Sequence, residues 1–193
     1  GTDRSKTAMY IDGNIHGNEI QAAETVLYTI WYLCKSYGKI NRITELIDER
    51  AFYFFPMANP DGREVWFHEA STPNYLRGGI RPVDNDHDGM KDEDGPEDLD
   101  GDGHITNMWI RDPLGRYEIN EEDPRFFVRV KGDAPPGGWS RIGQEGIDND
   151  DDGRVNEDGK GGYDPNRNWP ADWQPEWIQF GATDYPFSLP ETK

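Results

Sequence analysis

The sequence predicts an α/β fold, in which a mixed, mainly parallel central sheet is flanked by helices and interrupted by a long irregular insertion. Two short apolar runs, residues 8–11 and 51–57, have the composition of buried strands. Between them, residues 18–37 repeat apolar side chains at helical spacing, which predicts an amphipathic helix with one face toward a core. A strand, a helix and a second strand in this order are typical of a parallel sheet.

The other elements are predicted by local signals along the chain. Gly38 ends the first helix, and a shorter helix is expected over residues 40–48. Residues 59–62 read Asn-Pro-Asp-Gly, which is a strong turn signal. From there to residue 165 the regular pattern stops, and only residues 107–111 and 125–131 are short strand candidates. An irregular stretch of this length is either functional or held together by something other than an apolar core.

The formal net charge of −18 is concentrated in two stretches of the chain. Residues 84–106 hold ten acidic residues and one basic residue, and residues 148–159 hold six and one. We expect no nucleic-acid partner, because binding to phosphates requires a basic surface. No apolar run approaches the length of a membrane-spanning helix, so no membrane span is expected. The sequence leaves the oligomeric state open.

The two acidic stretches contain three similar loops. Residues 84–95 read DNDHDGMKDEDG and residues 148–159 read DNDDDGRVNEDG, which agree at eight of twelve positions, and residues 98–106 read DLDGDGHIT. Each loop has acids at positions one, three and five and glycine at position six, the spacing of an EF-hand calcium loop. Alternate residues supply the oxygen ligands that Ca²⁺ prefers, and the glycine permits a sharp turn. The expected calcium ligands are Asp84, Asp86, Asp88, Asp92, Asp98, Asp100, Asp102, Asp148, Asp150 and Asp152.

The three loops differ from EF-hands in one respect. None has the glutamate that EF-hands place at position twelve, so the loops are more similar to those of extracellular calcium-binding modules. Weak sites of this kind are filled where calcium is millimolar, and we therefore expect a secreted or periplasmic protein. The loops alone also fit solvated acidic turns, or a calcium-stabilised extracellular binding module without activity.

A second candidate site lies where the first strand gives way to a helix. His16 and Glu19 are three residues apart, which places both side chains on one side of a helical turn. Imidazole and carboxylate groups are ligands of Zn²⁺, and a catalytic zinc takes three protein ligands plus an open position. The spacing therefore indicates two zinc ligands, although a surface helix with the same pair needs no metal.

Four motifs in a fixed order make the sequence similar to a known family. They are IHGNE at residues 15–19, NPDG at 59–62, NYLR at 74–77 and YDPNRNW at 163–169. Together they resemble the zinc metallocarboxypeptidase family of the carboxypeptidase A type. The resemblance covers residues 7–77 and 160–193, and the acidic loops between them look like an insertion found in some bacterial relatives.

The resemblance implies a role for several residues. His16 and Glu19 match two zinc ligands of the family. Asp164 matches the carboxylate that orients the ligating histidine through its second ring nitrogen. Arg77 matches the arginine that polarises the scissile carbonyl and stabilises the oxyanion.

The same resemblance implies a substrate with a free carboxylate, which is the C-terminus of a peptide or protein. Asn166 and Arg167 match the pair that holds this carboxylate, to which a guanidinium offers two parallel hydrogen bonds. The implied reaction is hydrolysis of the C-terminal peptide bond by a zinc-activated water. An amidohydrolase or deacylase acting on an N-acyl amino acid would use the same scaffold, so it stays an alternative.

The resemblance is to part of a domain. In the family, a histidine as third zinc ligand and a glutamate as general base lie beyond the position that matches Lys193. Residues 1–82 are therefore expected to be the N-terminal part of the catalytic α/β domain, residues 83–160 a calcium-binding insertion, and residues 161–193 the truncated continuation. The 193-residue chain by itself is expected to bind zinc weakly and to lack peptidase activity.

Overall fold

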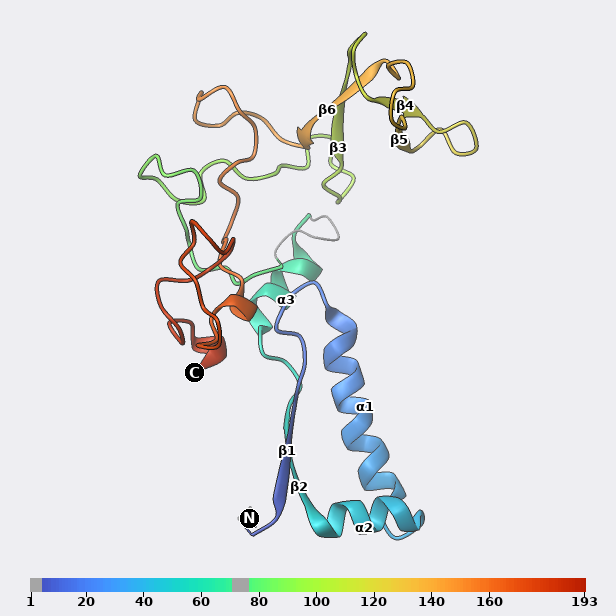
Figure 1. The fold of residues 1–193 in the computed structure, drawn as a ribbon, viewed down its shortest axis with the longest axis vertical. Coiled ribbons are helices and arrows are strands. Elements are labelled where there is room, and N and C mark those ends of the chain that lie inside the picture. Colours follow the sequence, from blue (N-terminus) through green and yellow to red (C-terminus); the bar gives the residue numbers. More distant parts are fainter. Residues whose placement is uncertain (1–4, 71–76) are drawn as a thin grey trace. The chain divides into compact units, whose positions relative to one another are not determined.

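The computed structural model describes residues 5–70 and 77–193, which form two compact units (Figure 1). The first unit contains Gly1–Val83 and Lys160–Lys193, and the second contains Asp84–Gly159. The fold is mixed α/β, with three α-helices and two separate sheets among the described residues.

The first unit is built on a parallel pair of strands. Strand β1 (Thr7–Asp12) pairs with β2 (Arg50–Phe55) along its whole length, without a shift in register. Helices α1 (Ile20–Ser36) and α2 (Asn41–Glu49) connect the two strands, and α1 runs alongside them (Figure 1). The strand, helix and strand predicted from the apolar pattern are therefore present, within a few residues of the expected ends.

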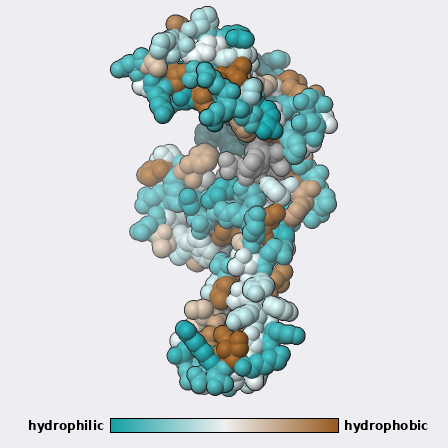
Figure 2. All heavy atoms as spheres, turned by 90° about the vertical axis from the view of Figure 1, so that its right-hand side faces the viewer, coloured by the Kyte–Doolittle hydropathy of each residue, from teal (hydrophilic) through white to brown (hydrophobic). Residues whose placement is uncertain are grey.

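The apolar face of α1 is less buried than the sequence predicts. Ala23 and Val26 are buried, whereas Leu27 and Trp31 are 49% and 54% exposed and Cys34 is also exposed. Hydrophobic side chains are visible on the surface in Figure 2. None of the helices in the described part of the chain is both long and apolar enough to cross a membrane.

A third helix stands where the sequence predicts a turn. Helix α3 (Pro60–His68) begins at the Asn-Pro-Asp-Gly motif, and the side chain of Asn59 accepts a hydrogen bond from the backbone of Gly62 at 2.9 Å. Asparagine at the N-cap followed by proline in the first turn starts a helix, because both satisfy or remove otherwise unpaired backbone donors. The motif was wrongly interpreted as the end of regular structure.

The C-terminal part of the first unit is held by one buried asparagine. Asn168 is fully buried and follows a short 3₁₀ helix, Pro165–Arg167. Its side chain donates to the carbonyl of Tyr185 at 2.8 Å and accepts from the backbone of Leu189 at 2.9 Å. A second 3₁₀ helix, Pro190–Thr192, follows directly. Side-chain hydrogen bonds therefore replace regular backbone pairing in this segment.

The second unit contains an antiparallel sheet. Its strands are β3 (Asn107–Arg111), β4 (Tyr117–Ile119), β5 (Phe127–Arg129) and β6 (Trp139–Gln144), in the spatial order β3-β6-β4-β5. The mainly parallel central sheet predicted from the sequence is not found among the described residues, which have two parallel strands in one unit and four antiparallel strands in the other.

Aromatic side chains hold this small sheet together. The rings of Trp109 and Phe127 stack with centroids 4.1 Å apart, and Trp139 meets Phe127 edge-on at 5.1 Å. Such ring pairs supply much of the apolar contact in a sheet that lacks a covering helix. Strands β4 and β6 were not expected, because three residues and a mostly polar sequence give no strand pattern.

Candidate functional site

His16 lies in a tightly held loop between β1 and α1. Asn14 has a left-handed backbone (φ 57°), and its buried side chain donates to the carbonyl of His16 at 2.6 Å. Gly17 donates its backbone N–H to the carbonyl of Arg77 at 3.1 Å. The loop is therefore fixed both by its own side chain and by a segment sixty residues away in the sequence.

The imidazole of His16 is buried, with 3% of the residue exposed, and its two nitrogens have different neighbours. Nε2 forms a 2.9 Å hydrogen bond with Oδ1 of Asp164. Nδ1 lies 3.0 Å from Oε1 of Glu19 but has no hydrogen-bond partner among the described residues. The hydrogen bond to Asp164 and the nearby Glu19 carboxylate raise the pKa of His16 above 6.5, although burial works in the opposite direction.

Asp164 is the centre of the polar contacts around His16. Its Oδ1 also accepts from the backbone of Asn166 at 2.8 Å, as the N-cap of the first 3₁₀ helix. Burial disfavours its charge, but the hydrogen bonds from His16 and Asn166 outweigh burial and lower the pKa of Asp164. The Nε of Arg77 lies 3.6 Å from its other oxygen.

The two arginines of the predicted site both lie near Oδ2 of this carboxylate. Arg77 Nη1 is 3.1 Å from Oε1 of Glu19, and Arg167 Nη1 is 4.0 Å from Oδ2 of Asp164. Both guanidinium groups are partly exposed, at 46% and 38% of the side chain. The side chain of Asn166 accepts from Trp169 Nε1 at 3.2 Å. Residues 74–76 of the NYLR motif lie outside the described residues.

The donor set around His16 fits zinc in part. A buried imidazole nitrogen without a hydrogen-bond partner, next to a carboxylate, is chemically suited to a Zn²⁺ ion. The histidine is held through its other nitrogen by a carboxylate, which is the usual support for a zinc-ligating histidine. Among the described residues, no third imidazole, thiolate or carboxylate completes a metal-holding group with His16 and Glu19.

Part of the chain is similar to known proteins. Residues 1–86 match the zinc carboxypeptidase family model. Carboxypeptidase D of Homo sapiens is 42% identical over 52 residues, which are 27% of this chain and 4% of that protein. Carboxypeptidase Z of Mus musculus is 38% identical over 74 residues, or 38% of this chain and 11% of that protein.

Part of the chain is also similar to carboxypeptidase D of Drosophila melanogaster. It is 32% identical over 71 residues, which are 37% of this chain and 5% of that protein. The chain thus spans only 4 to 11% of the length of these three curated relatives. No solved structure matches the chain.

The second unit lies almost entirely outside residues 1–86, which match the family model, and it contains the three acidic loops. In each loop the carboxylate at position one accepts from the backbone N–H of the glycine at position six. The distances are 3.1 Å for Gly89 to Asp84, 2.8 Å for Gly103 to Asp98 and 2.9 Å for Gly153 to Asp148. The three glycines have φ between 86° and 102°, a conformation that other residues rarely adopt. The three loops therefore share one turn.

Two of the loops, residues 84–95 and 148–159, are paired through their eleventh positions. Asp94 accepts from the backbone of Asn149 at 3.3 Å and of Asn156 at 2.8 Å. Asp158 accepts from the backbone of Asn85 at 3.0 Å and of Asp92 at 3.1 Å. Both aspartates are fully buried, and their backbones form a bridge. These donors are positions two and nine of the opposite repeat, so the two repeats contact each other reciprocally.

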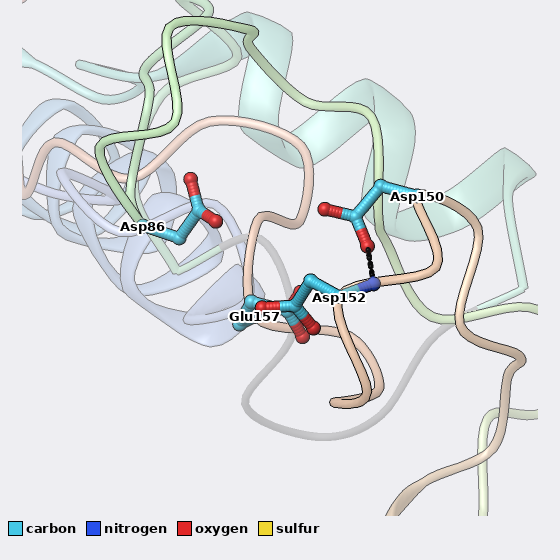
Figure 3. A group of neighbouring side chains, drawn as sticks. All are labelled: Asp86, Asp150, Asp152 and Glu157. Atoms are coloured by element: carbon cyan, nitrogen blue, oxygen red, sulfur yellow. Dashed lines mark hydrogen bonds between the residues drawn. The ribbon is translucent and has the colours of Figure 1, made fainter.

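Several of the predicted calcium ligands come together in four groups of carboxylates whose oxygens lie within 4.8 Å of one another. Figure 3 shows one of these groups, to which Asp86 comes from the first loop and the other three side chains from the third. Asp92, Asp102 and Asp148 belong to none of the groups found among the described residues. The groups are Asp86–Asp150–Asp152–Glu157, Asp86–Asp88–Glu93–Asp150, Asp84–Asp86–Asp158 and Asp98–Asp100–Glu145.

Sequence reasoning missed three glutamates in these groups. Glu93 and Glu157 both stand at position ten of their repeats, which is the one signal that singles them out. Glu145 lies outside the loops and is buried beside the second one. It accepts from the backbone of Leu99 at 2.8 Å and of Thr106 at 3.1 Å. The N–H of Thr106, with the other donors, lowers the pKa of Glu145 despite burial.

Proposed function

We propose that this chain is part of a zinc-dependent carboxypeptidase that hydrolyses the C-terminal peptide bond of peptides or proteins. The observation that carries the proposal is the environment of the two ring nitrogens of His16. Its Nε2 is held by Asp164 and its Nδ1 is buried without a hydrogen-bond partner beside Glu19. His16 and Glu19 lie within residues 1–86, which match the zinc carboxypeptidase family model, and they would give a zinc ion two ligands of the right chemistry.

In this proposal His16 and Glu19 are zinc ligands and Asp164 positions His16. Bound zinc would supply Lewis-acid activation of a water molecule and of the scissile carbonyl. The Asp164 carboxylate keeps a proton on Nε2, so that Nδ1 carries the lone pair that faces the metal site. Arg77 is close to both carboxylates and supplies positive charge where the oxyanion of the substrate develops.

Asn166 and Arg167 would bind the terminal carboxylate of the substrate. The side chain of Arg167 is 38% exposed, and its contact with Asp164 is long, at 4.0 Å. Its Nη1 donates to the backbone carbonyl of Asn166 at 3.1 Å, so the substrate carboxylate would be bound through the other N–H groups of the guanidinium. Arginine binds a planar carboxylate with two parallel hydrogen bonds, which favours a peptide with a free C-terminus.

We also propose that the second unit binds Ca²⁺ through its acidic loops and that the protein is secreted or periplasmic. The support is the shared turn of the three loops and the four groups of carboxylates, which offer only oxygen ligands. Calcium is the common cation that takes six to eight such ligands. Weak sites of this type are filled outside the cytosol, where calcium reaches millimolar concentration.

The zinc site is tested by titrating the chain with Zn²⁺ in competition with a coloured chelator. We expect weak binding, because the described residues offer two ligands where a catalytic zinc takes three. His16→Ala should abolish this binding. His68→Ala is the matched control, because His68 is exposed on α3 and pairs with Glu64 at 3.2 Å. Equal loss in both variants would contradict the assignment of His16.

Substrate recognition is tested with a pair of peptides that differ only at the C-terminus, one free and one amidated. The free acid should shift the NMR signals of the Asn166–Arg167 segment, and Arg167→Gln should remove the shift. Arg42→Gln, at an exposed position of α2, is the control. Equal binding of the amide would contradict a carboxypeptidase. Steady hydrolysis by this chain alone, stopped by a zinc chelator, would overturn the expectation of two ligands.

A further inference from the structure

Two of the acidic groups share Asp86 and Asp150, and exchange of the two repeats relates one group to the other. Exchanging the repeats turns Asp86, Asp88 and Glu93 into Asp150, Asp152 and Glu157, because both members of each pair have the same position in the twelve-residue motif. This exchange converts one group into the other. The reciprocal hydrogen bonds of Asp94 and Asp158 follow the same twofold relation.

Glu93 and Glu157 distinguish these groups from ordinary acidic turns, because their carboxylates are buried. Both carboxylate oxygens of Glu93 and both of Glu157 are buried and have no hydrogen-bond partner among the described residues. One oxygen of each glutamate lies within 4.8 Å of the aspartate oxygens of its group, and Figure 3 shows the group to which Glu157 belongs. Buried carboxylates without donors are costly unless a cation accompanies them.

The carboxylates of Asp86 and Asp150 form equivalent hydrogen bonds in the two repeats. Asp86 and Asp150 each accept a backbone N–H from the residue two positions later, at 3.0 Å in both repeats. One oxygen of each carboxylate is therefore bound by its own loop. The spread of oxygens within 4.8 Å is that of ligands which all lie about 2.3–2.6 Å from one calcium ion.

We propose that the paired repeats form one two-ion calcium centre, in which Asp86 and Asp150 serve both ions and Glu93 and Glu157 each serve one. One ion lies among Asp86, Asp88, Glu93 and Asp150, and the other lies in the group related to it by exchange of the repeats. The inference rests on the calcium binding proposed above and specifies its ligands and its stoichiometry. Since each ion takes ligands from both repeats, filling the centre fastens residues 84–95 to residues 148–159.

The chemistry of the groups favours calcium over other common cations. The groups contain carboxylates only, whereas zinc sites in proteins use histidine or cysteine as well. Magnesium demands a near-ideal octahedron and keeps several of its waters. A group of four carboxylates supplied by two loops is more easily accommodated by the larger and less directional Ca²⁺.

The centre is tested by equilibrium dialysis of the full chain against Ca²⁺. The second loop is first silenced by Asp98→Asn with Asp100→Asn, so that only the paired repeats are counted. We expect two ions per chain in this background. Asp86→Asn should weaken the binding of both ions, Asp88→Asn the binding of one, and Glu93→Gln the binding of one. Glu97→Gln, at an exposed position just after the first repeat, is the control and should leave both ions bound.

The possible results separate the two levels of the proposal. Absence of calcium binding by the unsubstituted chain would overturn the calcium role itself. Loss of only one ion from Asp86→Asn, or two ions retained by Glu93→Gln at unchanged affinity, would overturn the shared centre and leave the calcium role standing. A second measurement avoids variants that fail to fold. In the unsubstituted chain, bound Tb³⁺ should transfer excitation to Eu³⁺ added with it, and absence of transfer would contradict two adjacent ions.

Discussion

Asp94 and Asp158 are equivalent residues of two sequence repeats, and each caps the backbone of the other repeat. Asp94 receives its hydrogen bonds from residues 149 and 156, and Asp158 receives its own from residues 85 and 92. Both side chains are fully buried. The two repeats are therefore held together by two buried carboxylates and not by an apolar core.

Replacing Asp94 by alanine should loosen this closure. The change removes the acceptor of the backbone N–H groups of Asn149 and Asn156, at a cost of roughly 0.5–1.5 kcal/mol each. Amide hydrogen exchange of these two residues should become faster, as measured by NMR in the whole chain. Asp133→Ala, in an exposed loop of the same unit, is the control. Unchanged protection in Asp94→Ala would show that the capping bonds contribute nothing.

The hydrogen bond between His16 and Asp164 should determine zinc affinity. Asp164→Asn removes the charge that holds the imidazole in one tautomer, and losses of about 10- to 100-fold are typical of such supporting residues. The measurement is the zinc competition titration. Asp48→Asn is a suitable control, because Asp48 is exposed on α2 and accepts a hydrogen bond from the hydroxyl of Tyr37 at 2.9 Å. Similar affinity in both variants would argue against a positioning role.

The raised pKa of His16 makes the metal-free chain more stable in acid. The hydrogen bond to Asp164 raises the pKa of the folded state above the ordinary value of 6.5. The stabilisation is therefore complete below pH 6.5 and is lost as the pH rises through the pKa of the folded state. NMR titration of the imidazole in the presence of a chelator measures this pKa. In Asp164→Asn it should fall, and a pKa that stays raised would assign the shift to Glu19 instead.

Gly17 should tolerate no larger residue, because it packs against the start of α3. A Cβ at this position would lie 2.4 Å from the carbonyl carbon of Gly62, so the backbone would have to move. Gly17→Ala should lower the free energy of unfolding by about 1–3 kcal/mol. It should also displace His16, which is the preceding residue. Gly79→Ala is the control, since the nearest atom to its Cβ would be 3.8 Å away. Urea unfolding of the two variants compares them directly.

The elements that the sequence predicts well are those with a regular apolar pattern. Residues 18–37 were expected to be helical and α1 spans Ile20–Ser36, while the candidate at residues 107–111 coincides with β3. Helix α3 was missed because Asn59 and Pro60 serve equally in a turn and at a helix start. Strand β6 was missed because it depends on pairing with β3 and not on its own composition.

Local sequence patterns also predict only part of each candidate site. The spacing of His16 and Glu19 indicates a pair of ligands, but the partner of His16 lies 148 residues away, and only the resemblance to a family pointed to it. Within a single loop, nothing about the glutamate at position ten indicates metal binding, and only its recurrence in both repeats singles it out. Glu93 acquires its role only when the other repeat brings Asp150 to it, so no analysis of a single loop finds it.

The first and last residues of the second unit lie next to each other. Asn85 donates its backbone N–H to Asp158 and its side-chain amide to the carbonyl of Gly159, at 3.0 Å and 3.4 Å. Because the ends of this segment are bound to each other, the entropic cost of closing the loop is offset within the segment. For the rest of the chain, the segment then acts as a short connection. If the second unit binds calcium as proposed, withdrawal of the ion should weaken this closure and convert the segment into a long flexible loop. The melting temperature of the α/β unit would then respond to an ion bound by the other unit.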